Sequence, residues 1–178
     1  AIAKLPAGIQ VVLCAGAPDT PEIAAETEAL VEDLRSRRTG VVWISDFLSR
    51  GKIIQLLSCS TVFVTPSIYE PLGIVNLEAM AVGLPVVGTK TGGIPDCIED
   101  GVTGTLVPIE QLDDGTGTPV HPETFEADLA SALEAVCADP EKAREMGAAG
   151  RKRVEEHFSW ESIALKTMDF YRDVIAGL

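Results

Sequence analysis

The chain has 178 residues, and the 46% of them that are hydrophobic are enough to bury one substantial core of single-domain size. Its formal net charge of −13 at pH 7 would repel polyanions, so nucleic acid and an anionic membrane surface are excluded as expected partners. No apolar run approaches the roughly 20 residues of a membrane span, and the first residues do not resemble a signal peptide, so we expect a cytoplasmic protein.

Short apolar runs rich in β-branched residues alternate along the chain with longer amphipathic segments. Nearly continuous apolar strands are typical of parallel sheets that are covered on both faces. The predicted strands are 9–16, 41–47, 61–67, 84–89 and 104–108. The predicted helices between them are 21–37, 49–60, the stretch that follows Glu70, and 94–101. This alternation indicates an α/β fold with a doubly wound parallel sheet.

A polar loop rich in Gly, Thr and Pro follows Pro108, and three helices are predicted after it, at about 122–139, 140–156 and 159–177. We expect these helices to pack on the domain, with Trp160, Phe170 and Tyr171 as packing residues.

Two kinds of residue in this chain could suggest a metal or a redox site. The pair Asp113-Asp114 lacks the oxygen-ligand spacing of a calcium loop, so no metal is expected there. The four cysteines lie about forty residues apart without a CxxC pair, and we expect reduced, mostly buried thiols.

The stretch "EPLGIVNLE" from Glu70 to Glu78 places one acid before an apolar helix and a second acid inside it. In an open α/β sheet, ligands bind beyond the C-terminal ends of the strands, where helix N-termini present free amides. Gly73 opens this helix, and its missing side chain would let a phosphate approach the amides of Leu72, Gly73 and Ile74. We therefore predict an anion site at this helix end, supported by the helix dipole.

The apolar residues of this helix predict that it is largely buried, which makes Glu78 an unusual buried carboxylate. A ligand hydroxyl would be a suitable partner for it. Eight residues of helix span roughly 12 Å, a length that reaches from the sugar of a nucleotide diphosphate sugar to its ribose. The alternative is a structural one, in which Glu70 caps the helix and Glu78 pairs with a lysine or arginine.

The stretch "EPLGIVNLEAMAVGLPVVGTKTGGIPDCIEDGVTG" resembles the Glu-x7-Glu signature of retaining glycosyltransferases with the two-domain B-type fold. Together with "CAGAPDTPEIAAE", it looks most similar to the bacterial glycogen synthases of that family. The resemblance implies a hexosyltransferase of glycogen biosynthesis that moves glucose from a nucleotide diphosphate sugar, ADP-glucose, to an α-glucan or another sugar acceptor. It implies no metal and no other cofactor, because binding of the departing diphosphate would be the main catalytic device.

The resemblance also implies roles for individual residues. In the family the first acid, here Glu70, contacts the donor sugar and is the catalytic candidate, and the second acid, here Glu78, binds the ribose. The amides of 72–74 would hold sugar and phosphate, 45–47 would line the base pocket, and 91–93 would border the sugar. The implied donor-binding residues are Leu72, Gly73, Ile74, Glu78, Ser45, Phe47, Thr91, Gly92 and Gly93.

The family has two features that this sequence does not contain: an acceptor-binding N-terminal domain, and a strand with a Gly-Arg…Lys loop that clamps the diphosphate. We therefore expect 1–178 to be the donor-binding domain of a longer two-domain enzyme, inactive by itself. The first strand of such a sheet lies centrally. Without it we expect a five-stranded sheet with the gap closed or filled by another chain, or else native residues before Ala1.

Two other functions compete with a donor-binding domain. One is a noncatalytic nucleotide-binding or regulatory module of the same fold. The other is a nicotinamide-binding dehydrogenase domain, which "CAGAPD" disfavours because it lacks G-x-G-x-x-G.

Overall fold

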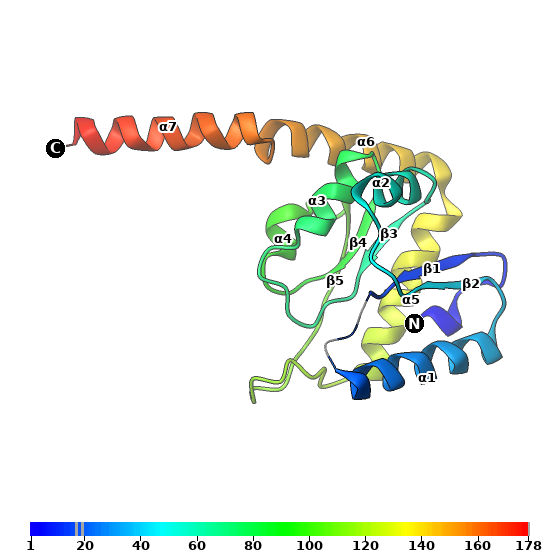
Figure 1. The fold of residues 1–178 in the computed structure, drawn as a ribbon. Coiled ribbons are helices and arrows are strands. Elements are labelled where there is room, and N and C mark those ends of the chain that lie inside the picture. Colours follow the sequence, from blue (N-terminus) through cyan, green and yellow to red (C-terminus); the bar gives the residue numbers. More distant parts are fainter. Residues whose placement is uncertain (17, 19, 178) are drawn as a thin grey trace.

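The computed structural model describes residues 1–16, 18 and 20–177 and has an α/β fold with parallel strands (Figure 1). The strands are β1 (Val11–Cys14), β2 (Val41–Ile44), β3 (Phe63–Thr65), β4 (Val86–Thr89) and β5 (Gly104–Val107). The helices are α1 (Pro21–Arg37), α2 (Arg50–Ser58), α3 (Ile74–Ala81), α4 (Ile94–Cys97), α5 (Pro122–Ala138), α6 (Pro140–His157) and α7 (Trp160–Ala176), preceded by a 3-10 turn, η1 (Ile2–Lys4). The predicted fold class and order of elements are confirmed.

The strands form two separate parallel sheets. One has the order β1-β2 and the other β3-β4-β5. Within the described part of the chain no strand pairing joins β1 to β3, so the expectation that the gap would close is wrong for this structure. That another chain or residues before Ala1 would supply the missing strand stays a prediction. Both sheets instead pack on one hydrophobic cluster built largely from α5, with Val11 of β1 and Val64 of β3 touching it. The helix therefore holds the two sheets in place without a shared ladder of hydrogen bonds.

β4 is the centre of the molecule because both of its faces are covered. All four of its residues are buried. Val87 belongs to the cluster on the α5 side, whereas Val86 belongs to a second cluster formed with residues of α2, α3 and α4. An apolar strand with no solvent face is what a parallel sheet between two helical layers requires.

α6 packs closely over the second cluster. A Cβ on Gly147 of α6 would lie 1.9 Å from the carbonyl oxygen of Gly83, and one on Gly150 would lie 3.4 Å from Met80. Glycine at these two positions lets the backbone of α6 approach the end of α3. This contact fixes α3 between α6 and the sheet.

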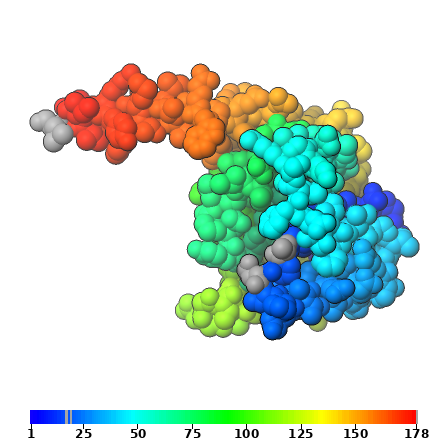
Figure 2. Space-filling model, viewed as in Figure 1, coloured from blue at the N-terminus to red at the C-terminus, as the bar shows by residue number. Residues whose placement is uncertain are grey.

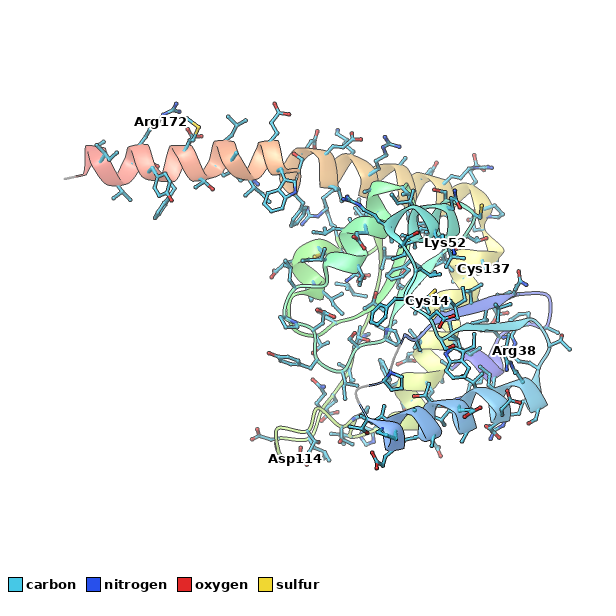
Figure 3. The ribbon with its side chains drawn as sticks, in the orientation of Figure 1. Cys14, Arg38, Lys52, Asp114, Cys137 and Arg172 are labelled. Atoms are coloured by element: carbon cyan, nitrogen blue, oxygen red, sulfur yellow. The ribbon has the colours of Figure 1, made fainter. Side chains whose placement is uncertain are left out.

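Capping residues explain where several helices begin. The Thr20 hydroxyl accepts a hydrogen bond from the amide of Ile23, and Asp139 accepts one from Lys142, so each satisfies a free donor in a first turn. At the other end of α1, the buried Arg38 donates to the carbonyl oxygens of Ile2 and Ile9, which ties the N-terminal segment to this helix (Figure 3).

α7 does not pack on the domain, which corrects the prediction for the C-terminal helix. It extends from the end of α6 away from the body, and Arg172 lies near its far end (Figures 1, 2 and 3). None of its residues is buried, and Trp160, Phe170 and Tyr171 are all exposed. The apolar residues thus form an exposed helix face. Over residues 1–16, 18 and 20–177, no helix combines the length and the apolar character needed to cross a membrane.

The cysteines are free, but only part of the prediction about them holds. Cys97 is buried and Cys137 is partly buried, whereas Cys14 and Cys59 are exposed, so "mostly buried" is wrong. Cys14 is the last residue of β1, and Cys59 directly follows α2. Partial burial raises the pKa of the Cys14 and Cys137 thiols.

Candidate functional site

Three loops meet at one edge of the β3-β4-β5 sheet. Because the strands are parallel, the loops 66–73, 90–93 and 108–121 all leave from the same edge. The side chain of Gln111 connects them. Its amide nitrogen donates to the carbonyl oxygens of Ile68 at 2.6 Å and Gly117 at 2.8 Å, and its oxygen lies 3.5 Å from the Thr91 hydroxyl. Sequence reasoning missed Gln111, because nothing near position 111 indicates contact with residue 68.

The loop after β4 lies directly on the loop after β3. The Gly93 amide donates to the carbonyl oxygen of Glu70 at 2.9 Å. A Cβ on Gly92 would lie 2.0 Å from that oxygen, and a Cβ on Gly93 would lie 2.4 Å from the carbonyl oxygen of Pro71. Only glycine fits this close approach. The structure thus brings Glu70, Gly92 and Gly93 together, and their role beside a donor sugar stays a prediction.

Gly73 immediately precedes α3 and has φ 85° and ψ 51°, a left-handed conformation that favours glycine. A Cβ on it would lie 3.3 Å from Glu70 Cγ, so the side chain of Glu70 lies beside the start of the helix. Among the described residues, none accepts a hydrogen bond from the backbone amide of Ile74 or Val75. These amides are therefore available to an anion, while the Asn76 amide donates to the Gly73 carbonyl.

Asn76 is a buried polar residue in the first turn of α3 that sequence reasoning missed. Its side-chain oxygen accepts a hydrogen bond from the Thr65 hydroxyl at the end of β3. Its side-chain nitrogen is buried and has no partner in the part of the chain that the structure describes. That nitrogen would lie 2.5 Å from a Cβ on Gly73, so it points toward the helix start. The available signal was an amide residue within an otherwise apolar run.

The prediction that α3 is largely buried is wrong. Asn76, Ala79 and Met80 form the buried face, whereas Ile74 is 62% exposed and Glu78 is exposed. Composition alone could not show this, because α3 packs on α6 and the sheet with one face only. Glu78 lies on the same exposed face as Ile74, four residues along the helix. Within the described chain Glu78 has no salt-bridge partner, so the alternative of a structural ion pair is not seen.

Ser45 and Phe47 follow β2 and belong to the two-stranded sheet. Both are exposed, and Phe47 is 85% exposed. Its ring lies 3.8 Å from the position that a Cβ would take on Gly16, just after β1. Leu72 is also exposed, whereas Thr91 is partly buried beside Gln111.

The loop after β5 forms a short excursion with Asp114 at its tip (Figure 3). Hydrogen bonds from the hydroxyl and the amide of Thr116 lower the pKa of Asp114 and explain this acid as a turn residue. Across the described residues, no group of three or more His, Cys, Asp or Glu side chains is placed to hold a metal ion.

Comparison with known proteins gives related sequences and structures. Residues 38–153 match the model of the family "Glycosyl transferases group 1". The chain is 51% identical to alpha-maltose-1-phosphate synthase of Mycolicibacterium smegmatis over 94% of this chain and 41% of that protein. It is 32% identical to glycogen synthase of Mycobacterium tuberculosis over 70% of this chain and 27% of that protein.

Solved structures show the same architecture. Sucrose-phosphate synthase from Thermosynechococcus elongatus is 31% identical with a TM-score of 0.72, over 95% of this chain and 39% of that one. Anabaena HepE in complex with UDP-glucose is 23% identical and supports the fold alone, with a TM-score of 0.75 over 97% of this chain and 43% of that one. The chain thus spans about two fifths of the first relatives that it matches. The match over residues 38–153, which include the loops at the candidate site, shows that the chain belongs to the glycosyl transferases group 1 family.

Proposed function

We propose that the chain is the donor-binding half of a retaining hexosyltransferase, and that its donor is a nucleotide diphosphate sugar, ADP-glucose. The observation that carries the proposal is the start of α3. There the left-handed Gly73 and the side chain of Glu70 lie beside the amides of Ile74 and Val75, which donate no hydrogen bond within the described part of the chain. The amides at the helix start could bind a phosphate, and the Glu70 carboxylate beside them could accept hydrogen bonds from sugar hydroxyls.

The amides of α3 would bind the diphosphate despite the net charge of −13. A helix N-terminus carries about half a positive elementary charge, and its effect is local. As the bond to the sugar breaks, negative charge grows on the departing diphosphate. Fixed amides at that position stabilise this charge without rearranging, which is the main contribution that such a site makes to catalysis.

The two glutamates would bind opposite ends of the donor. Glu70 is partly buried beside Gly73 and Gly93, where it can accept hydrogen bonds from the sugar hydroxyls. Glu78 lies on the exposed face of α3 and has no salt-bridge partner among the described residues, so its carboxylate could accept hydrogen bonds from the ribose hydroxyls. Because Glu78 is exposed, the cost of burying an unpaired carboxylate no longer argues for a ligand partner. The proposed role of Glu78 therefore rests on its position along α3 and on the family resemblance.

The acceptor would be a sugar phosphate, glucose 1-phosphate, bound by a part of the enzyme outside these 178 residues. The relative that is 51% identical is named for its product, maltose 1-phosphate. Transfer of a glucosyl unit to glucose 1-phosphate produces that molecule. The α-glucan acceptor suggested by the glycogen synthase resemblance has the weaker support of a 32% identical relative.

Calorimetric titration tests the donor site directly. We expect the chain to bind ADP and ADP-glucose and not NAD. Titration with UDP-glucose tests whether the site distinguishes adenine from uracil. Glu78→Gln should weaken binding of ADP and ADP-glucose alike, whereas Glu70→Gln should weaken ADP-glucose much more than ADP. Glu134→Gln, on an exposed face of α5, is the matched control. Binding of ADP-glucose that is equal in all three variants and the parent would refute the assigned roles.

The acceptor is tested on the full-length enzyme. Incubation with ADP-glucose and glucose 1-phosphate should yield a disaccharide phosphate, while glycogen in place of glucose 1-phosphate should accept little glucose. Faster transfer to glycogen would favour the glucan acceptor. A noncatalytic module would bind the nucleotide and transfer glucose to neither.

A further inference from the structure

α4 is a single turn of helix that connects the core to the candidate site. At its start, the Gly93 amide donates to the carbonyl oxygen of Glu70 at 2.9 Å. At its end, the thiol of Cys97 lies 3.2 Å from the carbonyl oxygen of Leu72 and can donate to it. Helices this short do not hold their shape by themselves. The place of α4, and of the loop 66–73 attached to it, therefore depends on tertiary contacts.

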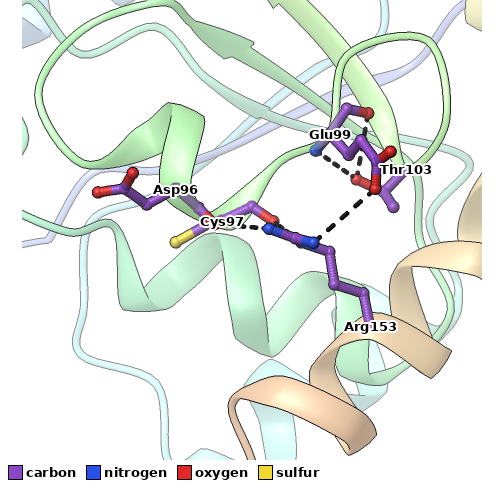
Figure 4. A network of polar contacts seen from close by, with 5 residues as sticks. All are labelled: Asp96, Cys97, Glu99, Thr103 and Arg153. Atoms are coloured by element: carbon purple, nitrogen blue, oxygen red, sulfur yellow. Dashed lines mark hydrogen bonds and ion pairs between the residues drawn. The ribbon is translucent and has the colours of Figure 1, made fainter.

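Arg153 of α6 supplies the main polar contact to the C-terminal end of α4 (Figure 4). Its Nε donates to the carbonyl oxygen of Cys97 and its Nη2 to that of Asp96, both at 3.0 Å. The last carbonyls of a helix have no partner within the helix, and the planar guanidinium fork can satisfy two of them at once.

The guanidinium group of Arg153 is itself held in place. A carboxylate oxygen of Glu99 lies 3.8 Å from Nη1, and the ring of Phe158 lies 5.6 Å from the guanidinium carbon. Thr103 in turn accepts a hydrogen bond from the Glu99 amide at 2.9 Å (Figure 4). The side chain is 27% exposed, so solvent does not compete freely for its donors.

We propose that Arg153 is a positioning residue for the sugar end of the donor site, an inference that rests on the proposed donor function. Arg153 holds the C-terminal carbonyls of α4, and α4 holds the backbone of Glu70 and Leu72 through Gly93 and Cys97. The amides of Ile74 and Val75 belong to α3, which is held separately by its packing on α6 and the sheet. Loss of the Arg153 contacts should thus disturb the sugar end more than the phosphate end.

Two substitutions on α6 separate this role from a general effect of removing an arginine. Arg153→Met keeps an aliphatic stem and removes every donor. Arg151→Met removes an exposed guanidinium whose partner is Glu155 on the same helix, so it serves as the control. Arg153→Lys keeps the charge but loses the two-donor fork and should rescue only part of the effect.

Amide hydrogen exchange tests the structural part without any ligand. In Arg153→Met we expect the Gly93 amide to exchange about tenfold faster than in the parent, because hydrogen bonds to charged groups contribute at least that factor. The Val87 amide in β4 should keep its rate, and Arg151→Met should change neither rate. An unchanged Gly93 rate, or equal acceleration of Gly93 and Val87, would overturn the proposal.

Calorimetric titration tests the functional part. Arg153→Met should weaken ADP-glucose by about tenfold while leaving the affinity for ADP within about twofold, and Arg151→Met should leave both unchanged. Equal weakening of both ligands, or of neither, would contradict a role at the sugar end. If the parent binds neither ligand, the donor function fails and this inference fails with it. Normal binding by the parent with unaltered binding by Arg153→Met refutes only the role of Arg153.

Discussion

Replacing Gly93 by alanine should destabilise the protein through one steric contact. Gly93 has φ −87° and ψ 0°, a conformation that alanine adopts, so the substitution adds no backbone strain of its own. The new Cβ would lie 2.4 Å from the carbonyl oxygen of Pro71 and 2.6 Å from Leu72 Cα. Both are backbone atoms, which cannot rotate away as a side chain would. The loop 66–73 must therefore shift away from α4.

The size of the effect follows from these distances. Real Cβ atoms almost never approach another atom within 3.0 Å, so the loop must move by at least about 0.6 Å. Overpacking of this kind costs about 1–3 kcal/mol in free energy of unfolding. For a domain of this length, each kcal/mol lowers the melting temperature by about 2–4 °C.

Urea denaturation and thermal melting measure this cost against a matched control. Gly51 lies in the first turn of α2, and a Cβ on it would meet nothing within 4 Å. Gly51→Ala should therefore leave stability unchanged or raise it by up to about 1 kcal/mol. A Gly93→Ala variant within about 0.5 kcal/mol of the parent would show that the loop and α4 do not approach as closely as described.

Two further changes test the buried pair behind the site and the exposed helix. Thr65→Val and Asn76→Ala each leave one partner of a buried hydrogen bond unsatisfied. A double-mutant cycle in urea should therefore give a coupling free energy of about 1 kcal/mol. If the two losses in free energy of unfolding simply add, the pairing is refuted. Ending the chain after Phe158 removes α7, none of whose residues is buried, and should change the free energy of unfolding by less than about 0.5 kcal/mol; a larger loss would show that α7 packs on the body.

Local signals in the sequence were sufficient to place most secondary structure. The helix predicted over 21–37 has those bounds in the structure, because Thr20 caps it and Pro21 suits its first turn. The strand over 84–89 was equally clear, since an unbroken apolar run suits a strand covered on both faces. Such signals depend on a few neighbouring residues and need no knowledge of the tertiary structure.

Burial could not be predicted in the same way. α3 and α7 are both rich in apolar residues, yet one is buried on a single face and the other has no buried residue. Which face of a helix is covered depends on what packs against it, and the sequence of the helix does not contain that information.

The proximity of two residues of the candidate site is explained by strand order, whereas sequence reasoning missed the residues that reach the site through distant contacts. Glu70 and Gly93 follow neighbouring parallel strands, so their proximity could be expected. Gln111 contacts a residue 43 positions away and Arg153 one 56 positions away, and no local pattern indicates either contact.

The stability of the protein should also depend on alkaline pH through Cys97. Burial, followed by the nearby Asp96 carboxylate, raises the pKa of this thiol to about 11, although Arg153 acts in the opposite direction and Glu70 adds to the rise. Between pH 9 and about 11 the unfolded chain loses the Cys97 proton while the folded chain keeps it. The stabilising contribution is therefore complete below pH 9 and is lost as the pH rises through the pKa of the folded state.

Cys97→Ser provides the test, because serine can still donate to the carbonyl oxygen of Leu72 but does not titrate in this range. We expect the free energy of unfolding, measured in urea at several pH values from 8 to 11, to fall less steeply for Cys97→Ser than for the parent. Some slope should remain, because burial also raises the pKa of Cys14 and Cys137. Equal slopes in the two proteins would mean that Cys97 titrates like an exposed thiol. That result is incompatible with a thiol at the end of α4 that is buried against the loop carrying Glu70.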